Sequence, residues 1–535
     1  AATRVNADGN IEKETSNLLL QSNSFNTTWL LNTTSATSGQ SGYDGTNDAW
    51  LLNSTTTGSP RIQQTISQGG VSTFSVYAKA ATNDYIQLRA QGISSEAWFN
   101  LSTGAVTNTT GADYVDSNIT SVGSGWYRCS LTFNGTITAL RIYPASAFGV
   151  YSTSGNGVYI QDAQLNQGLV VQPYQETTTT AVYGGITDNT PRLDYTDSSC
   201  PALLLEPLRT NLVIQSEYPN SASGNGNPRV IGNATATYNY GISPEGLQNS
   251  TLITGTNGNN GVQVNFTNSD VSVDWSYSYY IKGTAGDTIS MRFELNPYYS
   301  NGSEYITLTG DWQRVEKKIT YDATSHSSKN FYITFVSIST ATEFELYGIQ
   351  VEQNASYPTS YIPTYGSSVS RVAETCTDAG TSATFNSTEG VLYAEINALI
   401  DPVDFNNWLT ITDGTNANSV GIVFETTGTA TARIEVGGVG QAYMNTSVDY
   451  SNFIKVAFKY KENDFAWWVN GVEVRTDSSG ITFPSNTLNS LQFAYGGGSN
   501  NWAGKVKELI VFPTALSNAD LEILTGTYYE SYSAM

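Results

Sequence analysis

The chain has 535 residues, of which 13% are charged, 39% are hydrophobic and 12% are aromatic. Its 46 acidic and 24 basic residues give a net charge of −22, which disfavours nucleic acid as a partner because phosphate binding requires clustered Lys and Arg. One His, three Cys without a CxxC spacing and the lack of any apolar run of about 18 residues argue against a zinc site, a His-dependent triad and a membrane-spanning helix.

Residues 1–16 are predicted to form an N-terminal arm, and because the chain begins with Ala1 rather than Met we expect processing ahead of that residue. Residues 17–176 are predicted to form the first folded unit. In the segment FSVYAK, Phe74–Lys79, alternate residues are apolar, which is the period of a half-buried strand. The rest of the unit contains many short strands and almost no helical periodicity.

This unit is repeated later in the chain. Four landmarks recur in one order: NLLLQS and NLVIQS (Asn17–Ser22, Asn211–Ser216), FSVYAK and YSYYIK (Phe74–Lys79, Tyr277–Lys282), WYR and WQR (Trp126–Arg128, Trp312–Arg314), and YIQDAQLNQ and LYGIQVEQ (Tyr159–Gln167, Leu346–Gln353). The spacings differ, but the order is kept, which chance similarity seldom achieves. Residues 17–176 and 211–365 are therefore predicted to be two copies of one antiparallel β-sandwich or jelly roll.

Two linkers are predicted between the units. The first, residues 177–210, contains PRLDYTDSSCPALLL (Pro191–Leu205), in which two short apolar strands flank turn residues and predict a hairpin. The second, residues 366–388, is rich in Ser, Thr and Gly.

Residues 389–535 are predicted to form a third, different unit. Apolar residues alternate in Val391–Ile400, and DFAWWVNGVEV (Asp464–Val474) predicts a hairpin, because Asn-Gly tolerates the positive φ angles of a type I′ turn. SNADLEIL (Ser517–Leu524) predicts one short helix, with Ser517 as its cap and Asp520 at capping-box spacing.

The units resemble known families. FAWWVNGVEV (Phe465–Val474), WAGKVKELIVF (Trp502–Phe512) and TALSNADLEIL (Thr514–Leu524) resemble the concanavalin-like, laminin-G-type jelly roll. NLLLQSNSF, FSVYAK, WYRCSLTF and VYIQDAQL resemble carbohydrate-binding-module jelly rolls. The predicted fold class is all-β: tandem antiparallel β-sandwich or jelly-roll domains followed by a C-terminal concanavalin-like jelly roll.

The linear arrangement resembles tailed-bacteriophage virion proteins, typically fibre, tail or decoration proteins. The segments that carry this resemblance, together with the laminin-G-type end, are Ala2–Glu12, Pro191–Ser216 and Ser360–Cys376. The resemblance implies a non-enzymatic structural protein on the virion surface, with other virion proteins and a host-surface glycan as partners. It also implies a homo-oligomer, with a trimer as the first expectation. The charge balance and the lack of a long apolar run predict neither nucleic acid binding nor membrane insertion.

Aromatic side chains are the candidate glycan contacts, because a pyranose packs its C–H face on a Trp or Tyr ring while its hydroxyls bind polar side chains. Four Trp residues in polar, loop-like surroundings are candidates: Trp98, Trp275, Trp408 and Trp502. Burial in the core or at a subunit interface is the competing interpretation for each of them.

The resemblance implies one candidate cofactor, a structural calcium ion, since jelly rolls of both resembled types often hold Ca²⁺ through carboxylates and backbone carbonyls. Asp44, Asp48 and Asp162 are the candidate ligands, and no DxDxDG loop occurs. In the second copy Tyr347-Gly348 replaces Gln161-Asp162, so an equivalent site there is doubtful. Solvated surface acids are the alternative interpretation.

Two functional hypotheses follow. The first is a virion protein that exposes lectin-like modules for attachment to host glycans, for particle assembly, or for both. The alternative is an accessory protein of a carbohydrate-active enzyme, or a bacterial surface adhesin, built from the same modules. Catalysis is not expected, because paired carboxylates can be judged only by geometry and any chain with 46 acids contains pairs.

Overall fold

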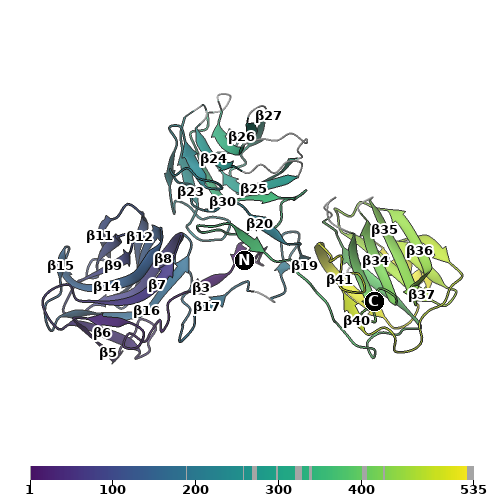
Figure 1. The fold of residues 1–535 in the computed structure, drawn as a ribbon, viewed down its shortest axis with the longest axis horizontal. Coiled ribbons are helices and arrows are strands. Elements are labelled where there is room, and N and C mark those ends of the chain that lie inside the picture. Colours follow the sequence, from purple (N-terminus) through teal and green to yellow (C-terminus); the bar gives the residue numbers. More distant parts are fainter. Residues whose placement is uncertain are drawn as a thin grey trace.

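The computed structural model describes residues 2–187, 190–256, 258, 260–267, 274–296, 299–319, 328–336, 340–399, 406–425 and 428–526. Within these ranges nearly all regular structure is antiparallel β-strand, so the predicted all-β class is confirmed. Figure 1 shows three sheet assemblies, coloured purple to blue, teal, and green to yellow, with the N-terminus between them. They are called the first, second and third unit below.

The first unit packs two sheets face to face. One has the order β11-β10-β9-β14-β7-β4, with β15 paired to β14, and the other has the order β12-β13-β8-β16-β6-β5. The strands are β4 (Leu30–Asn32), β5 (Thr34–Gln40), β6 (Ala49–Ser54), β7 (Arg61–Gln68), β8 (Val71–Ala80), β9 (Tyr85–Gln91), β10 (Ser95–Asn100), β11 (Ala105–Thr110), β12 (Tyr114–Gly123), β13 (Trp126–Asn134), β14 (Ile137–Ala147), β15 (Val150–Tyr151) and β16 (Gly157–Gln167). Phe74, Val76 and Ala78 are fully buried between the sheets, as their alternation predicts.

The second unit repeats this plan with the orders β21-β24-β29-β26-β27 and β22-β23-β30-β25-β28. The strands are β21 (Pro228–Ile231), β22 (Thr235–Thr237), β23 (Thr251–Thr254), β24 (Gly261–Phe266), β25 (Trp275–Lys282), β26 (Thr288–Asn296), β27 (Tyr299–Thr307), β28 (Gln313–Ile319), β29 (Ser328–Phe335) and β30 (Glu343–Gln353). In both copies the long last strand contains a bulge, at Asp162 in β16 and near Gly348 in β30, and both residues have a positive φ.

The third unit packs a sheet of order β36-β35-β34-β33-β40 on one of order β18-β19-β41-β32-β37-β38-β39. The strands are β18 (Leu193–Asp194), β19 (Ala202–Leu205), β32 (Glu389–Ile396), β33 (Asn407–Thr412), β34 (Ser419–Glu425), β35 (Thr429–Val436), β36 (Val439–Ser447), β37 (Ile454–Lys461), β38 (Phe465–Val469), β39 (Val472–Asp477), β40 (Ser490–Gln492) and β41 (Gly504–Phe512). The predicted Asn470-Gly471 turn is confirmed by φ angles of 47° and 81°.

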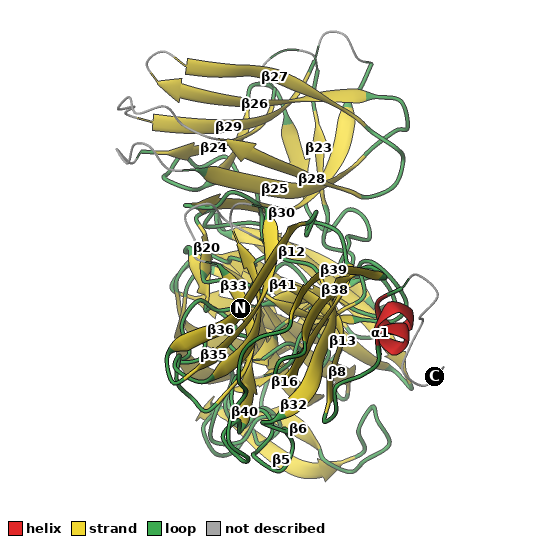
Figure 2. Cartoon of the chain, turned by 90° about the vertical axis from the view of Figure 1, so that its right-hand side faces the viewer, coloured by secondary structure: helices red, strands yellow, loops and turns green. Residues whose placement is uncertain are grey.

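The predicted helix is α1 (Asn518–Thr525), and Figure 2 shows it beside β38 and β39. The Ser517 hydroxyl accepts the Asp520 backbone N–H at 3.2 Å, which confirms the predicted cap. Leu521 and Leu524 are buried against the outer side of the sheet.

Within the segment predicted to be the first linker, β18 pairs with β19 as a hairpin. Strand β19 continues the sheet of the third unit by pairing with β41, so this linker is an integral part of that unit. Three two-stranded ladders complete the junction: β1 (Thr3–Val5) with β2 (Ile11–Lys13), β3 (Thr15–Asn17) with β17 (Val182–Gly184), and β20 (Arg209–Asn211) with β31 (Val369–Arg371).

A buried ionic network stabilises the junction. The Glu206 carboxylate binds Arg192 and Arg371, each at 2.8 Å, and accepts the Ser360 backbone N–H at 2.8 Å. Arg192 also pairs with Glu374. Burial alone would raise the pKa of Glu206, but the two arginines and Ser360 lower it to about 2.

Candidate functional site

The outer face of the β10-β9-β14-β7 sheet combines aromatic and cationic side chains. Directly paired residues of an antiparallel sheet project to the same face, and the alternate residues of β9 and β14 are buried in the core. One cross-strand row therefore contains Gln63, Arg141, Arg89 and Glu96, one from each strand.

The row beside it contains Tyr143, Gln87 and Trp98. These two rows, with Arg61, Phe148 and Tyr151, are called the first face below.

Two guanidinium groups share one neutral oxygen on this face. Arg141 Nε donates to Gln63 Oε1 at 3.0 Å, and Arg61 Nε donates to the same oxygen at 3.4 Å. Arg89 pairs with Glu96 at 3.7 Å, and Arg61 lies 6.0 Å from the centre of the Tyr143 ring. All three arginine side chains are only partly buried, so a ligand can reach them.

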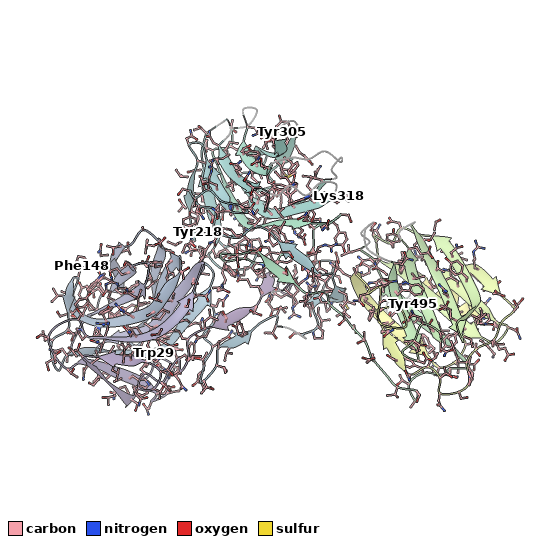
Figure 3. All side chains as sticks on the ribbon, viewed as in Figure 1. Trp29, Phe148, Tyr218, Tyr305, Lys318 and Tyr495 are labelled. Atoms are coloured by element: carbon pink, nitrogen blue, oxygen red, sulfur yellow. The ribbon has the colours of Figure 1, made fainter. Side chains whose placement is uncertain are left out.

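An aromatic group adjoins the arginines. Tyr151 stacks on Trp98 at 5.6 Å and on Tyr143 at 5.1 Å between ring centres, and Phe148 meets Trp98 edge-on at 5.5 Å. Trp98 is 3% exposed, whereas Phe148 is 51% exposed, and Figure 3 shows Phe148 on the outer side of the first unit. The β14–β15 hairpin therefore covers Trp98 and presents Phe148 to solvent.

Gln87 lies in the row between Tyr143 and Trp98 and is fully buried. Neither its Nε2 nor its Oε1 has a well-formed hydrogen bond, and Arg89 Nε is likewise buried without one. A buried polar group left unpaired costs about 1–3 kcal/mol, so native structures rarely retain one without a water, an ion or a functional reason.

Part of this pattern recurs on the matching face of the second unit. Gln263, Tyr332 and Arg292 form one cross-strand row, in which the Arg292 guanidinium lies 4.5 Å from the Tyr332 ring centre. Gln263 Nε2 binds the Tyr332 hydroxyl oxygen at 3.2 Å. Arg292 also forms an ion pair with Glu294 at 2.9 Å. Arg229 of β21 pairs with Gln263 in the same row and has no ion pair among the described residues.

The four predicted Trp contacts fall into two classes. Trp98 in β10 and Trp408 in β33 project to outer faces, away from the main cores, and are 3% and 6% exposed. Trp275 and Trp502 are 0% and 1% exposed and belong to the central cores. The structure does not bring the four together, because they come from three separate units.

For Trp275 and Trp502 the competing interpretation, burial in the core, is the one that the structure has. Trp275 begins β25 and packs 5.7 Å from Phe266, and Trp502 meets Phe424 edge-on at 5.1 Å. The polar segment before Trp502 is a loop, but the rings of both residues turn inward to fill the space between two sheets.

Trp408 forms the centre of a second aromatic group, on the third unit. Its ring lies 4.2 Å from that of Tyr495, which Figure 3 labels, and 5.9 Å from the Arg433 guanidinium. Tyr495 donates to Glu435 at 2.8 Å, and Glu435 also pairs with Arg433. Trp408 is covered by Tyr495 much as Trp98 is covered by Tyr151.

The three predicted calcium ligands lie around the bulge of β16 without sharing a binding point. Gln161 Nε2 donates to Asp48 at 2.8 Å and to Asp44 at 3.3 Å, whereas Asp162 accepts the Tyr43 hydroxyl at 2.9 Å. Among the residues that the structure describes, no group of three or more His, Cys, Asp or Glu is placed to hold a metal ion. The arrangement therefore does not fit a calcium ion held by these three carboxylates.

Asp162 has an unusual environment at this bulge. Burial raises the pKa of its carboxyl to about 6, an effect that hydrogen bonds from Tyr43 and Tyr174 reduce and that the nearby Asp48 and Asp44 increase.

In the second copy a lysine occupies the equivalent corner. Lys13 Nζ, from β2 of the N-terminal arm, lies 3.0 Å from Glu217 and 2.8 Å from Glu245, and its side chain is 4% exposed. Tyr347 donates to Glu245 at 3.0 Å and Tyr365 donates to Glu217 at 3.2 Å. Burial alone would lower the pKa of Lys13, but the two glutamates raise it well above its usual value. The arm is thereby anchored to the second unit by a buried cation.

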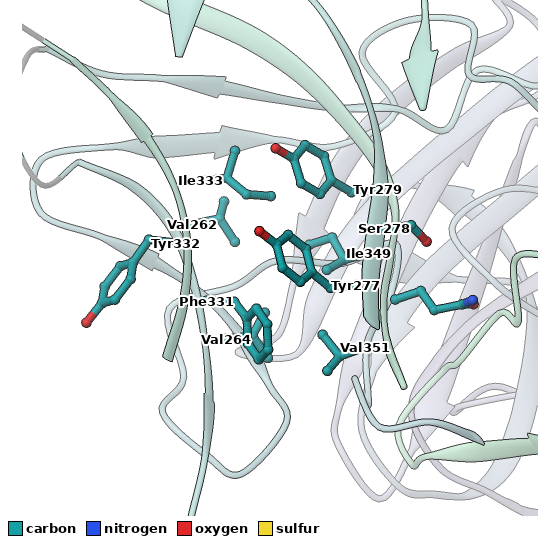
Figure 4. Close-up of a pocket in the computed structure, with 11 residues that line it drawn as sticks. Val262, Val264, Tyr277, Ser278, Tyr279, Phe331, Tyr332, Ile333, Ile349 and Val351 are labelled. Carbon is teal, nitrogen blue, oxygen red and sulfur yellow. The ribbon is translucent and has the colours of Figure 1, made fainter. Parts of the chain in front are cut away.

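A cavity of about 10 Å³ lies between the sheets of the second unit (Figure 4). Tyr277 and Tyr279 project into it, and the Tyr279 hydroxyl is buried without a hydrogen-bond partner. This volume holds about one water molecule, so the cavity is a packing defect and not a ligand site.

In the described part of the chain, no helix is long and apolar enough to cross a membrane.

No family model matches the chain, and no curated protein matches it. Among solved structures, the CBM40 of a Ruminococcus gnavus IT-sialidase bound to alpha2,3 sialyllactose is 15% identical and matches with a TM-score of 0.23 over 27% of this chain and 85% of that chain. The CBM22-1-CBM22-2 tandem domain of Paenibacillus barcinonensis Xyn10C is 13% identical, with a TM-score of 0.20 over 63% and 96%. Domains LG4-5 of the mouse laminin alpha1 chain are 11% identical, with a TM-score of 0.20 over 58% and 96%. At these TM-scores the matches carry no argument about function.

The sequence interpretation selected Trp98 but missed Gln87, Arg89, Arg141, Tyr143 and Tyr151. A signal for the first three was present, because polar and apolar residues alternate in YIQLRAQ of β9 and polar residues alternate with core residues in β14. Tyr151 could not be found this way, because it reaches the face through a tertiary contact.

Proposed function

We propose that this chain is a non-enzymatic glycan-binding protein whose ligand contacts lie on the outer faces of its sheets. The observation that carries the proposal is the first face, where Trp98, Tyr143 and Tyr151 stack beside two rows of Arg and Gln. Aromatic rings accept the C–H face of a sugar, while guanidinium and amide groups bind its hydroxyls.

Binding would use both the aromatic rings of the β14–β15 hairpin and the residues that this hairpin covers. Phe148 and Tyr151 are the rings nearest to solvent, and the arginine row next to them is accessible. A sugar held against these rings would place its hydroxyls over the arginines, and a movement of the β14–β15 hairpin would add Trp98 and Gln87 to the contact.

We also propose that the protein belongs to the surface of a tailed-bacteriophage particle and assembles as a homo-oligomer with other virion proteins. The support is the sequence resemblance of the whole linear arrangement. The composition of the first face supports binding rather than catalysis. Its two rows contain one carboxylate, Glu96, whereas glycoside hydrolysis ordinarily uses two carboxylates. An accessory protein of a carbohydrate-active enzyme, or an adhesin, is the second candidate.

A glycan array probed with the full chain tests the proposal. We expect bound glycans, and we expect Trp98→Ala to weaken binding by roughly twofold to tenfold, since a lost aromatic contact is worth about 0.5–1.5 kcal/mol. Trp408→Ala is the matched variant, because it removes the equivalent covered Trp from the third unit and shows which face binds.

Circular dichroism must show that both variants are folded. An array without any bound glycan would refute glycan binding, and release of reducing sugar by the wild-type chain would refute the non-enzymatic part.

A further inference from the structure

The first face carries positive charge in an acidic chain. The whole chain has 46 acidic and 24 basic residues, yet the two rows and the adjoining strand end contain Arg61, Arg89 and Arg141 against a single carboxylate, Glu96. Three cations and one anion reverse the overall balance of the protein. A neutral ligand does not require such a reversal.

Two of these cations lack a charge partner. Arg61 and Arg141 donate to the same Gln63 oxygen, so their guanidinium groups lie side by side. In the described ranges neither has a carboxylate within 4.0 Å, whereas Arg89 has Glu96. An amide oxygen accepts hydrogen bonds but does not neutralise charge, so the repulsion between the two groups remains.

The first face also contains hydrogen-bond donors that lack a well-placed acceptor among the described residues. Arg89 Nε and Nε2 of the fully buried Gln87 are donors without a well-formed hydrogen bond. Together with the two arginines they form a set of donors beside a stack of aromatic rings. A ligand anion would provide both the acceptor and the charge that this set lacks.

The other outer faces differ in this respect. Arg292 on the second unit pairs with Glu294, and Arg433 on the third unit pairs with Glu435. Each of these arginines therefore already has a carboxylate partner of its own. Arg229 of the second unit, which pairs with Gln263, has no carboxylate within 4.0 Å among the described residues, but it has no second unpaired arginine beside it. Two adjacent arginines without a carboxylate therefore distinguish the first face from this matching face.

We propose that the first face selects an anionic glycan, whose carboxylate or sulfate group binds between Arg61 and Arg141 while its sugar ring lies against Tyr151 and Phe148. This inference rests on the proposed function and specifies its ligand class. Guanidinium groups bind carboxylate and sulfate oxygens through parallel hydrogen bonds, which a neutral hydroxyl cannot match in strength.

Calorimetric titration of the full chain with two matched pairs of probes tests the inference. Oligogalacturonate and its methyl ester differ in the carboxylate charge, and dextran sulfate and dextran differ in the sulfate groups. We expect at least one anionic member to bind roughly tenfold or more tightly than its neutral partner, because a hydrogen bond to a charged group is worth about twice a neutral one. High salt should reduce that difference.

The double variant Arg61→Gln/Arg141→Gln should lose this preference and bind the anionic and neutral members within about twofold of each other. Arg475→Gln removes a charge from an exposed position in β39 of the third unit and should leave the preference unchanged. The pair that discriminates identifies the anion as carboxylate or sulfate.

Equal affinity of the wild-type chain for both members of both pairs would overturn the inference while leaving glycan binding intact. An anionic preference that survives in the double variant would also overturn it, because the anion would then bind elsewhere. The absence of binding to any glycan on the array is a different result, which removes the proposed function itself.

Discussion

Lys13→Met should destabilise the second unit more than any surface substitution of the same kind. Lys13 is the cation between Glu217 and Glu245, whose side chains are 2% and 8% exposed. The substitution leaves two carboxylates facing each other without a cation, and breaking a buried ion pair in this way costs about 3–5 kcal/mol. For a unit of this size, each kcal/mol shifts the midpoint by about 2–4 °C, so the transition should fall by roughly 6–20 °C.

Differential scanning calorimetry of the full chain is the appropriate assay, since separate units can give separate transitions. Lys461→Met is the matched control, because Lys461 pairs with Glu389 at 3.0 Å on the surface with its side chain 51% exposed. That variant should leave the unfolding temperature nearly unchanged, because an exposed ion pair is screened by water and salt.

The triple variant Lys13→Met/Glu217→Gln/Glu245→Gln should recover much of the loss, because neutral amides remove the facing charges. If Lys13→Met unfolded at the same temperature as Lys461→Met, the buried ion triad would not stabilise the second unit and the reasoning would be refuted.

Three further predictions concern stability. Glu206 has a pKa of about 2 against 4.5 for an unperturbed Glu, so its ionised form stabilises the folded chain by about 3 kcal/mol above pH 4.5 and this contribution is lost as pH falls through 2. Urea titrations between these pH values should therefore show a steeper loss of stability in the wild type than in Glu206→Gln, and parallel profiles would contradict the assignment. Tyr279→Phe removes a buried hydroxyl without a partner and should be neutral or stabilising within about 1 kcal/mol, whereas a larger loss would reveal a bound water. Ser517→Ala should cost the third unit about 1 kcal/mol of capping free energy in thermal unfolding, and no change would mean that α1 is held by packing alone.

Local signals predicted the elements of this fold well. The alternation in Phe74–Lys79, the Asn470-Gly471 turn and the Ser517 cap each depend on a few neighbouring residues, and each is present in the structure. The strand pairings over long distances were not predictable in the same way. Leu203 pairs with Val506, and nothing in ALLL indicates that this strand completes the sheet of the third unit.

The candidate site was only partly predictable, because exposure depends on which side of a strand a ring occupies and on what covers it. Trp98 and Trp502 are both preceded by polar segments, yet one projects to an outer face and the other fills a core. Alternation within a strand does give the face, as Gln87 and Arg89 between buried neighbours illustrate. The cover supplied by Tyr151 is a tertiary contact that no local pattern encodes.

Matching positions in the two copies of the repeated fold carry different charges, and this difference bears on the roles of the two copies. At the bulge of the last strand the first copy has Asp162 beside Asp44 and Asp48, while the second has Gly348 and receives Lys13 from the arm. The second copy thereby uses its acidic corner to anchor another segment of the chain.

The outer faces of the two copies also differ in how their arginines are paired. Arg292 of the second copy is neutralised by Glu294, whereas Arg61 and Arg141 of the first copy donate to one amide oxygen and have no carboxylate within 4.0 Å among the described residues. A charge that is paired inside the chain contributes to its own structure, and a charge left unpaired at an accessible surface is available to a ligand. Under the proposed function, recognition belongs to the first copy, whereas the acidic corner of the second copy anchors the arm through Lys13, although both copies share one sequence pattern.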